Sequence, residues 1–237
     1  MCPITSEKWS YVDENMIRSV PLFSALNAED QDELRSMMSE VSLRRGEKLF
    51  NEGDKGDRLY LIVEGKVKLG HTSGDGRDNL IAVLGPGEMI GELTLFDPGP
   101  RSTTATAVAA TRMMELDHDG MMRFIDAHPE LSKHMLKALA QRLRRTNNAL
   151  ADLVFSDVPG RVAKALLDLA DRFGHAGADG TVHVPHDLTQ EELAQLVGAS
   201  RETVNKSLAE FGSRGWLALE NRGVHLLDIE RLRRRAR

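Results

Sequence analysis

The spacing of apolar residues changes along the chain. From residue 41 to 116, short apolar runs such as RLYLIV at 58–63 alternate with turns that contain glycine. Many short strands separated by regular turns predict a β-sandwich or barrel. Residues 16–40 have a helical pattern instead, and Asn27 is a suitable N-cap for the segment DQDELRSMMSE.

A long helix is predicted over about 129–155, after a shorter helix around 117–126. The apolar residues of this helix follow a heptad pattern, in which Thr146 is the one polar residue. The favoured interpretation is a parallel two-stranded coiled coil, and therefore a homodimer. The alternative is an amphipathic helix that lies on its own core, although such helices usually show a wider stripe. The positions of the pattern alternate in steps of three and four: Leu136, Leu139, Leu143, Thr146, Leu150 and Leu153.

The last third of the chain predicts a helix, a loop, two short helices, a hairpin and a terminal helix. Pro159 and Gly160 are expected to mark a hinge or domain boundary, and Gly174 to end the first helix. The hairpin is expected to turn at 221–223. The Arg-rich segment 231–237 is expected to be a solvated tail with some attraction for phosphate.

The segment from Thr189 to Lys206 has the strongest functional pattern. TQEELAQLV has a capping box, a turn follows at Gly198, and a second N-capped helix begins after it. Its first turn has the residue types that contact guanine and cytosine edges, and hydroxyls at helix starts hold phosphates. A structural helical hairpin with a solvated charged face is the alternative, but the order of elements favours DNA binding. The candidate DNA-binding residues are Thr189, Ser200, Arg201, Glu202, Thr203 and Lys206.

The segment LTQEELAQLVGASRETVNKSLAEF closely resembles the helix-turn-helix of the cyclic-AMP receptor protein family. By this resemblance, Arg201, Glu202 and Lys206 would contact base edges in the major groove of DNA. Lys206 stands where family members often have arginine. The resemblance covers roughly residues 21–230 and looks closest to the actinobacterial branch of the family.

Residues 91–106, GELTLFDPGPRSTTAT, resemble the phosphate-binding cassette of cyclic-nucleotide domains. Arg101 suits a cyclic phosphate, and Glu92 suits a ribose 2′-hydroxyl. A buried Glu–Arg pair without a ligand is the structural alternative. The resemblance implies that the long helix closes over the base. The candidate residues for binding cyclic AMP are Gly91, Glu92, Leu93, Arg101, Ser102, Thr146 and Asn147.

Composition narrows the possible functions. The net charge is −5, and residues 156–237 have twelve basic and twelve acidic residues, so DNA binding would need a local basic face. Cys2 is the only cysteine, which excludes an internal disulfide and a four-cysteine iron–sulfur cluster. No apolar run is long enough to span a membrane and no signal peptide is evident, so a cytoplasmic location is predicted.

No catalytic motif is found, so an enzyme is not predicted. The eight histidines are scattered through the sequence. His183 and His186 have the spacing of a weak metal pair without an evident third ligand, and we expect no metal site.

These observations predict an α+β protein. We expect an N-terminal extension (1–20), a cyclic-nucleotide-binding β-roll or jelly roll (21–128), a dimerisation helix (129–155) and a winged helix-turn-helix (156–237). The predicted function is cyclic-AMP-responsive transcription regulation by a homodimer on a two-fold symmetric double-stranded DNA operator, with RNA polymerase as a further partner. Two alternatives stay open: a same-fold regulator with another effector or ligand-independent DNA binding, and a nucleotide-binding protein-interaction module.

Overall fold

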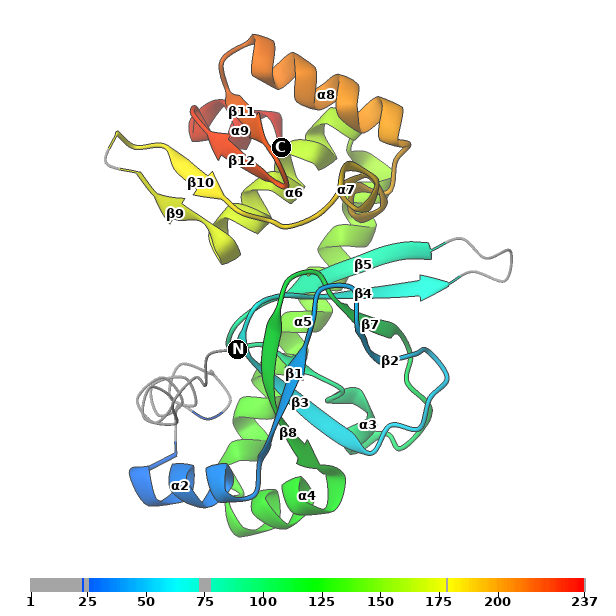
Figure 1. Cartoon of the computed structure of the whole chain (residues 1–237), viewed down its shortest axis with the longest axis vertical. Helices are drawn as coiled ribbons and strands as arrows, with labels where there is room; N and C mark the ends of the chain where they lie inside the picture. The colour runs from blue at the N-terminus through cyan, green and yellow to red at the C-terminus, as the bar shows by residue number, and fades with distance from the viewer. Residues whose placement is uncertain (1–22, 24–25, 73–77, 178, 237) are drawn as a thin grey trace, which may run out of the picture. The chain divides into compact units, whose positions relative to one another are not determined.

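A computed structural model describes residues 23, 26–72, 78–177 and 179–236 (Figure 1). The chain divides into two compact units, one of residues 1–69 with 83–144, the other of residues 70–82 with 145–237. Mixed helices and β-sheets confirm the predicted α+β class. The predicted extension at 1–20 lies outside the described residues, and the predicted domain boundaries stay a prediction.

Two four-stranded sheets form the β-rich region. Neighbouring strands pair antiparallel wherever their register is defined, as expected for short strands joined by tight turns. The first sheet has the order β1 (Ser39–Leu43), β8 (Thr111–Asp117), β3 (Arg58–Glu64) and β6 (Met89–Ile90). The second has the order β2 (Lys48–Phe50), β7 (Thr104–Ala107), β4 (Val67–Thr72) and β5 (Asp78–Leu84).

Strand β3 separates two hydrophobic cores because successive side chains point to opposite faces of a strand. Leu59 and Leu61 belong to the core that contains the helical residue Phe124. Tyr60 and Ile62 belong to the core that contains Val67, Leu69 and Ala105. Five consecutive buried residues in β3 follow from this position between two cores.

Two helices, α2 (Ala28–Ser36) and α4 (His118–Ala127), contribute residues to the first of these cores. Asn27 caps α2 as predicted, with its Oδ1 accepting from the Asp30 N–H at 2.9 Å. The predicted helix over 16–40 is too long at its C-terminal end. Residues 39–43 pair with β8 as strand β1, because that pairing satisfies their backbone groups within the sheet.

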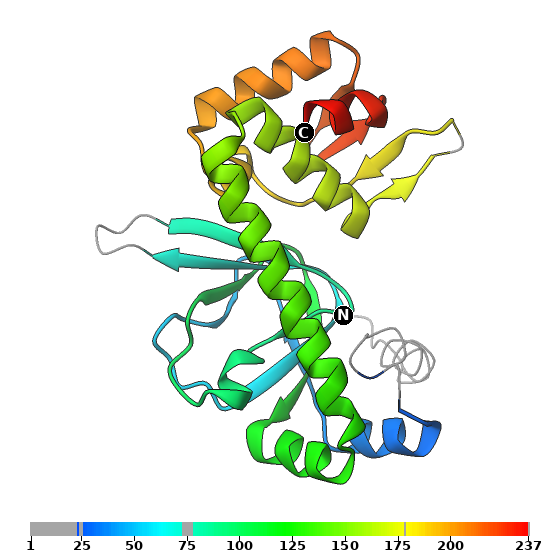
Figure 2. The same cartoon turned by 180° about the vertical axis from the view of Figure 1, so that it is seen from behind.

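Helix α5 (Glu130–Phe155) is one unbroken helix of 26 residues (Figure 2). Its first turns are anchored by Leu131 and Met135, which are buried. Most of the predicted heptad seam is exposed: Leu136 by 66%, Leu143 by 61%, Leu150 by 58% and Leu153 by 52%. Most of the seam therefore does not lie on a core of its own chain, and its leucines form an exposed apolar stripe.

The second unit surrounds helix α6 (Val158–Phe173), whose residues Val162, Ala163, Leu166 and Leu169 are buried at helical spacing. A four-stranded antiparallel sheet has the order β11 (Leu217–Glu220), β12 (Gly223–Leu226), β10 (Val182–Val184) and β9 (His175–Ala176). The remaining helices are α7 (Gln190–Val197), α8 (Arg201–Ser213) and α9 (Ile229–Arg235).

The predicted hinge or domain boundary at Pro159 and Gly160 stays a prediction, although α5 does end just before them, at Phe155. Both residues lie in the first turn of α6, where a missing proline N–H breaks no helical hydrogen bond. Asp157 caps this helix by accepting from the Gly160 N–H at 2.9 Å, and only Ser156 and Asp157 separate α6 from α5.

The C-terminal arginine segment is not simply a solvated tail. Residues 229–235 form α9, which packs on α6 and buries Leu232 completely. Arg235 donates a hydrogen bond to Asp157 Oδ2 at 2.5 Å. The hydrogen bond from Arg235, together with that from the Gly160 N–H, lowers the pKa of Asp157 below its ordinary value. The end of the chain therefore helps to hold the start of α6.

Candidate functional site

Arg101 is the central residue of the predicted nucleotide cassette, and only 4% of it is exposed. Its backbone N–H donates to Asp54 O at 2.7 Å, and its carbonyl accepts from the Gly53 N–H at 2.8 Å. The turn between β2 and β3 therefore bonds both the backbone N–H and the backbone carbonyl of Arg101. These two bonds explain how Arg101 is fixed beside β3, although the two are distant in the sequence.

The Arg101 guanidinium contacts groups from two strands, β2 and β3, and from one helix, α3 (Leu93–Phe96). Nη2 donates to Arg58 O at 2.7 Å, and Nη1 donates to Thr94 Oγ1 at 3.2 Å. The guanidinium carbon lies 4.3 Å from the centre of the Phe50 ring and 5.8 Å from that of Tyr60. Buried Nε has no hydrogen-bond acceptor among the described residues.

Burial lowers the pKa of Arg101, while Coulombic interaction with Tyr60 and Asp57 opposes this shift. Arginine has such a high ordinary pKa that the side chain remains cationic at neutral pH. The cassette therefore contains a buried positive charge with one N–H that remains available for an acceptor.

Gly91 is required by the close approach of this arginine. Its φ is +89°, which L side chains rarely adopt. A Cβ atom at this position would overlap Arg101 Nη1 and lie 2.7 Å from Arg58 O. The structure thus brings Gly91 and Arg101 together, as the cassette pattern predicts.

The other cassette residues differ in exposure. Glu92 is buried and precedes α3 (Leu93–Phe96). Leu93 is 46% exposed, and Ser102 is also exposed. Gly91, Glu92 and Arg101 thus form the enclosed part of the candidate site.

Sequence reasoning missed the residues that surround the arginine. Phe50 and Tyr60 come from strands about fifty and forty residues earlier, and no local pattern marks them as neighbours of Arg101. Burial raises the pKa of the Tyr60 phenol. Thr94 lies inside the cassette and could have been included, since a hydroxyl there can accept from a guanidinium.

Thr146 and Asn147 are exposed on α5. They belong to the second unit, whereas the cassette belongs to the first. Their predicted contact with a base stays a prediction.

Local hydrogen bonds define both helices of the predicted DNA-binding segment. Thr189 Oγ1 accepts from the Glu192 N–H at 3.2 Å, and Glu192 Oε2 accepts from the Thr189 N–H at 2.7 Å, which confirms the capping box. Ser200 Oγ accepts from the Thr203 N–H at 3.2 Å and caps α8. Gly198 has a φ of +69°, as the tight turn between the two helices requires.

Packing fixes the angle between these helices. Ala194 and Val204 are both buried. In a helix-turn-helix, a small residue is expected where the two helices approach closely, and a branched apolar residue is expected in the core between them. Arg161 of α6 donates to Val197 O at 3.0 Å and to Gly198 O at 3.2 Å. Sequence reasoning missed Arg161, which satisfies the C-terminal carbonyls of α7.

Helix α8 buries one side and presents the other. Val204, Leu208 and Phe211 are buried against the rest of the unit. Asn205, one position after Val204, is half-buried. The exposed surface at the start of α8 contains the predicted residues Ser200, Arg201, Glu202, Thr203 and Lys206.

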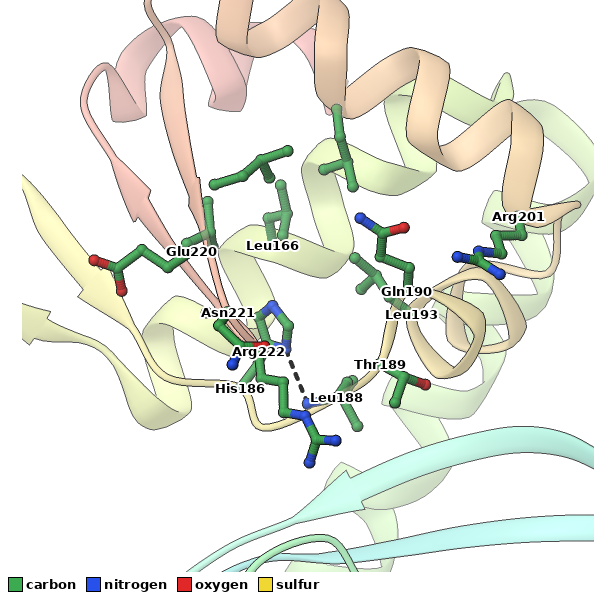
Figure 3. A pocket seen from close by; sticks show the side chains of 14 residues that line it. Leu166, His186, Leu188, Thr189, Gln190, Leu193, Arg201, Glu220, Asn221 and Arg222 are labelled. Carbon is green, nitrogen blue, oxygen red and sulfur yellow. Dashed lines mark hydrogen bonds between the residues drawn. The ribbon is translucent and has the colours of Figure 1, made fainter.

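A groove of about 340 Å³ lies beside the start of α8. Figure 3 shows Arg201 and Thr189 on one side of it and Arg222, from the β11–β12 turn, on another. Asp187 N–H donates to Arg222 O at 2.8 Å, and Leu188 N–H donates to His186 Nδ1 at 3.1 Å. The first of these bonds joins the hairpin turn to the loop that leads into α7, and the basic side chains of Arg201 and Arg222 border one groove.

Comparison with known proteins supports both parts of the chain. Residues 40–128 match the cyclic nucleotide-binding domain, and residues 160–235 match the Crp-like helix-turn-helix domain. The chain is 52% identical over 226 residues to a CRP-like cAMP-activated global transcriptional regulator of Mycobacterium tuberculosis, covering 95% of this chain and all of that one. It is 35% identical to a cyclic AMP receptor protein of Thermus thermophilus, covering 86% and 90% of the two chains.

Solved structures agree with this result. The Thermus thermophilus catabolite activator protein is 34% identical, with a TM-score of 0.52 and coverage of 91% of this chain and 98% of that chain. A CRP-family regulator from the same organism is 28% identical, with a TM-score of 0.70 and coverage of 83% and 96%.

The fold and the two sites define a class of protein with a cyclic-nucleotide-binding domain followed by a helix-turn-helix. Within that class, the chain belongs to the CRP family of transcriptional regulators. The resemblance predicted from the cassette and the helix-turn-helix is confirmed. No helix in the described part of the chain is long and apolar enough to cross a membrane.

The capping box gives a direct test of how the helix-turn-helix is stabilised. Thr189→Ala removes the hydroxyl that accepts from the Glu192 N–H, and we expect a loss of about 1 kcal/mol in the free energy of unfolding. Urea denaturation monitored by circular dichroism measures it. Gln190→Ala, one residue later and also exposed, is the control and should change stability by much less. Equal losses in both variants would contradict a capping role.

Proposed function

We propose that this protein is a cyclic-AMP-responsive transcription regulator that binds a two-fold symmetric DNA operator as a homodimer. The observation that carries the proposal is the buried Arg101 guanidinium, whose Nε has no acceptor among the described residues. A buried donor without an acceptor costs free energy, and a cyclic phosphate oxygen would supply a charge-assisted hydrogen bond. Relatives named as cAMP-activated support adenosine as the nucleoside.

The proposed cyclic-AMP site consists of the cassette and two residues of α5. Gly91 leaves the space that Arg101 occupies, and Arg101 binds the phosphate with help from the exposed Ser102. Glu92 accepts from the ribose 2′-hydroxyl, and the apolar Leu93 lies beside it at the start of α3. Thr146 and Asn147 bind the base, because amide and hydroxyl groups can pair with both donors and acceptors of adenine.

A second copy of this chain is the proposed partner of the exposed α5 seam. The a and d positions of three heptads are apolar except for Thr146, and four of the leucines are more than half exposed. A two-stranded coiled coil buries such a seam against an identical one. This arrangement also places two copies of α8 in one molecule, as a two-fold operator requires.

DNA binding is proposed for the capped starts of α7 and α8. Thr189, Ser200 and Thr203 contact phosphates, whereas Arg201, Glu202 and Lys206 contact base edges. Arg222 is added to this set as a phosphate contact, because it borders the same groove as Arg201. The whole molecule has a net charge of −5, so these local cations must supply the attraction to DNA.

The proposed switch is a population shift between two arrangements of the dimer. Cyclic AMP favours the arrangement in which the two α8 helices are about 34 Å apart, which is one turn of DNA. Its effect is limited by its differential affinity for the two arrangements, and such couplings are typically about 1–3 kcal/mol.

Three further features of the protein are proposed from its family membership. We propose that the protein acts without catalysis and works in the cytoplasm, where chromosomal DNA is accessible. RNA polymerase stays a predicted partner.

Replacement of the buried arginine tests the ligand site. Arg101→Leu should weaken cyclic-AMP binding at least tenfold, because hydrogen bonds to charged groups contribute about 1.5–3 kcal/mol. Isothermal titration calorimetry with cyclic AMP and cyclic GMP measures this loss and the base selectivity. Arg123→Leu, on the exposed side of α4, is the matched control. Absence of wild-type binding at millimolar nucleotide would overturn the proposed ligand.

Glu202 tests base recognition by α8. Glu202→Ala should relax preference at one base pair of an operator selected from random duplexes, by about 1–3 kcal/mol. Fluorescence anisotropy with matched and mismatched duplexes measures the difference. Glu210→Ala lies later on α8 and is exposed, so it should leave the preference unchanged. An unchanged footprint for both variants would favour a protein-interaction role for this unit.

The seam is tested by placing a charge in it. Leu143→Asp should convert the dimer to a monomer, because a charge at an a position must be desolvated in the coiled coil. Analytical ultracentrifugation measures the molecular mass. Gln141→Asp, on the same helix but outside the seam, should remain dimeric. A dimer for Leu143→Asp would place the interface elsewhere.

A further inference from the structure

The sheet of the second unit has an apolar inner face and a histidine-rich outer face. Val184, Val224 and Leu226 are buried on the inner side. His183 and His225 alternate with these residues, and they are direct register partners across β10 and β12. Side chains of register partners lie on the same face of a sheet, so the two imidazoles meet.

Strand β11 adds a carboxylate to the outer face. Ala218 is the register partner of His225, and Glu220 lies two residues further along β11, so it points to the same side. Glu220 Oε2 lies 2.9 Å from His183 Nε2, and Glu220 Oε1 lies 2.7 Å from His225 Nε2. The two imidazole rings stack with their centres 4.6 Å apart.

The three side chains present suitable metal-binding atoms at short range. One ligand atom from each residue lies within 4.8 Å of the others. Their side chains are 37–44% exposed, so an ion can reach them from solvent.

We propose that His183, His225 and Glu220 bind one Zn²⁺ ion or a similar divalent transition-metal ion. The ligands would be the two Nε2 atoms and a carboxylate oxygen, a donor set that suits zinc and not Ca²⁺ or Mg²⁺, which prefer oxygen alone. The ion displaces the two N–H···O hydrogen bonds, and each histidine binds in its neutral form with Nε2 deprotonated. Three protein ligands leave a fourth position for water.

His175 lies beside His183 on the same face of the sheet. It is the register partner of His183 on β9, and the two rings are 6.5 Å apart. The three imidazoles therefore form a row across β9, β10 and β12, with Glu220 at its β11 end.

This site differs from the pair considered from the sequence. His186 is buried, and its Nδ1 accepts from the Leu188 N–H at 3.1 Å, so it does not join His183. His183 and His225 instead meet in space, although the histidines are scattered through the sequence. Sheet register brings together residues that lie 42 positions apart in the sequence.

A bound ion would join three strands next to the hairpin turn. Glu220 is the last residue of β11, and Asn221 and Arg222 follow it in the turn that borders the groove beside α8. Metal binding would therefore stabilise the hairpin, since an ion that binds only the folded state favours that state. The site lies entirely within the second unit and does not depend on the proposed nucleotide site.

A second group of ligand-type side chains, Asp30, His128 and Glu130, is less suitable. It has one imidazole, and the His128 Nδ1 atom lies 3.5 Å from Asp30 and 3.6 Å from Glu130. It provides the main alternative location for a bound ion in the experiment.

The test uses untagged full-length protein, freed of metal with a chelator and then titrated with Zn²⁺ by calorimetry. We expect about one Zn²⁺ ion per chain, as one three-ligand site requires. His225→Asn and Glu220→Gln should each weaken binding at least tenfold, since loss even of a residue that only supports a ligand costs about 10–100-fold. His71→Asn, an exposed histidine on β4, should bind like wild type.

Two further measurements separate the outcomes. Visible absorption of bound Co²⁺ should show the bands of a nitrogen- and oxygen-ligated ion in wild type and lose them in His225→Asn. Added Zn²⁺ should raise the melting temperature of wild type but not of the two variants. Wild type without saturable Zn²⁺ binding would overturn the proposal. So would unchanged binding in His225→Asn combined with loss in His128→Asn, which would place the ion on the other group.

Discussion

The first unit depends on the burial of one guanidinium, that of Arg101. Removing a cation from water is costly unless its N–H groups find acceptors, and Arg101 finds them in Arg58 O and Thr94 Oγ1. This requirement explains why Gly91 has no side chain, because a Cβ atom would occupy the space of the arginine. It also leaves Nε without an acceptor among the described residues, and this donor connects the fold of the cassette to the proposed anion binding.

In the second unit, the packing of the helices orients the exposed polar side chains at the start of α8. Arg161 satisfies the carbonyls of the helix-turn-helix turn, and Arg235 binds the cap of α6. Because α7, α8 and α9 all pack on α6, the exposed start of α8 has a defined orientation within the unit. The outer face of the sheet is not needed for this packing, so its histidines and Glu220 are available for another role.

Local patterns were sufficient for much of the architecture. Caps such as Thr189 and Ser200 act over three residues, and the α5 seam repeats every seven, so both can be predicted without tertiary contacts. Pro159 lies in the first turn of α6 and not between the helices, because proline is favourable at the start of a helix.

The sequence by itself determined the class of fold, the two capped DNA-binding helices and the identity of the cassette arginine, since these depend on spacing within a few turns or on a contiguous motif. Tertiary structure alone decided what surrounds that arginine and which histidines meet. Phe50 and Tyr60 reach Arg101, and His183 reaches His225 and Glu220, only through the register of strands that are distant in sequence. Register arises from the packing of the whole sheet, because a shift of one residue would turn every side chain to the opposite face.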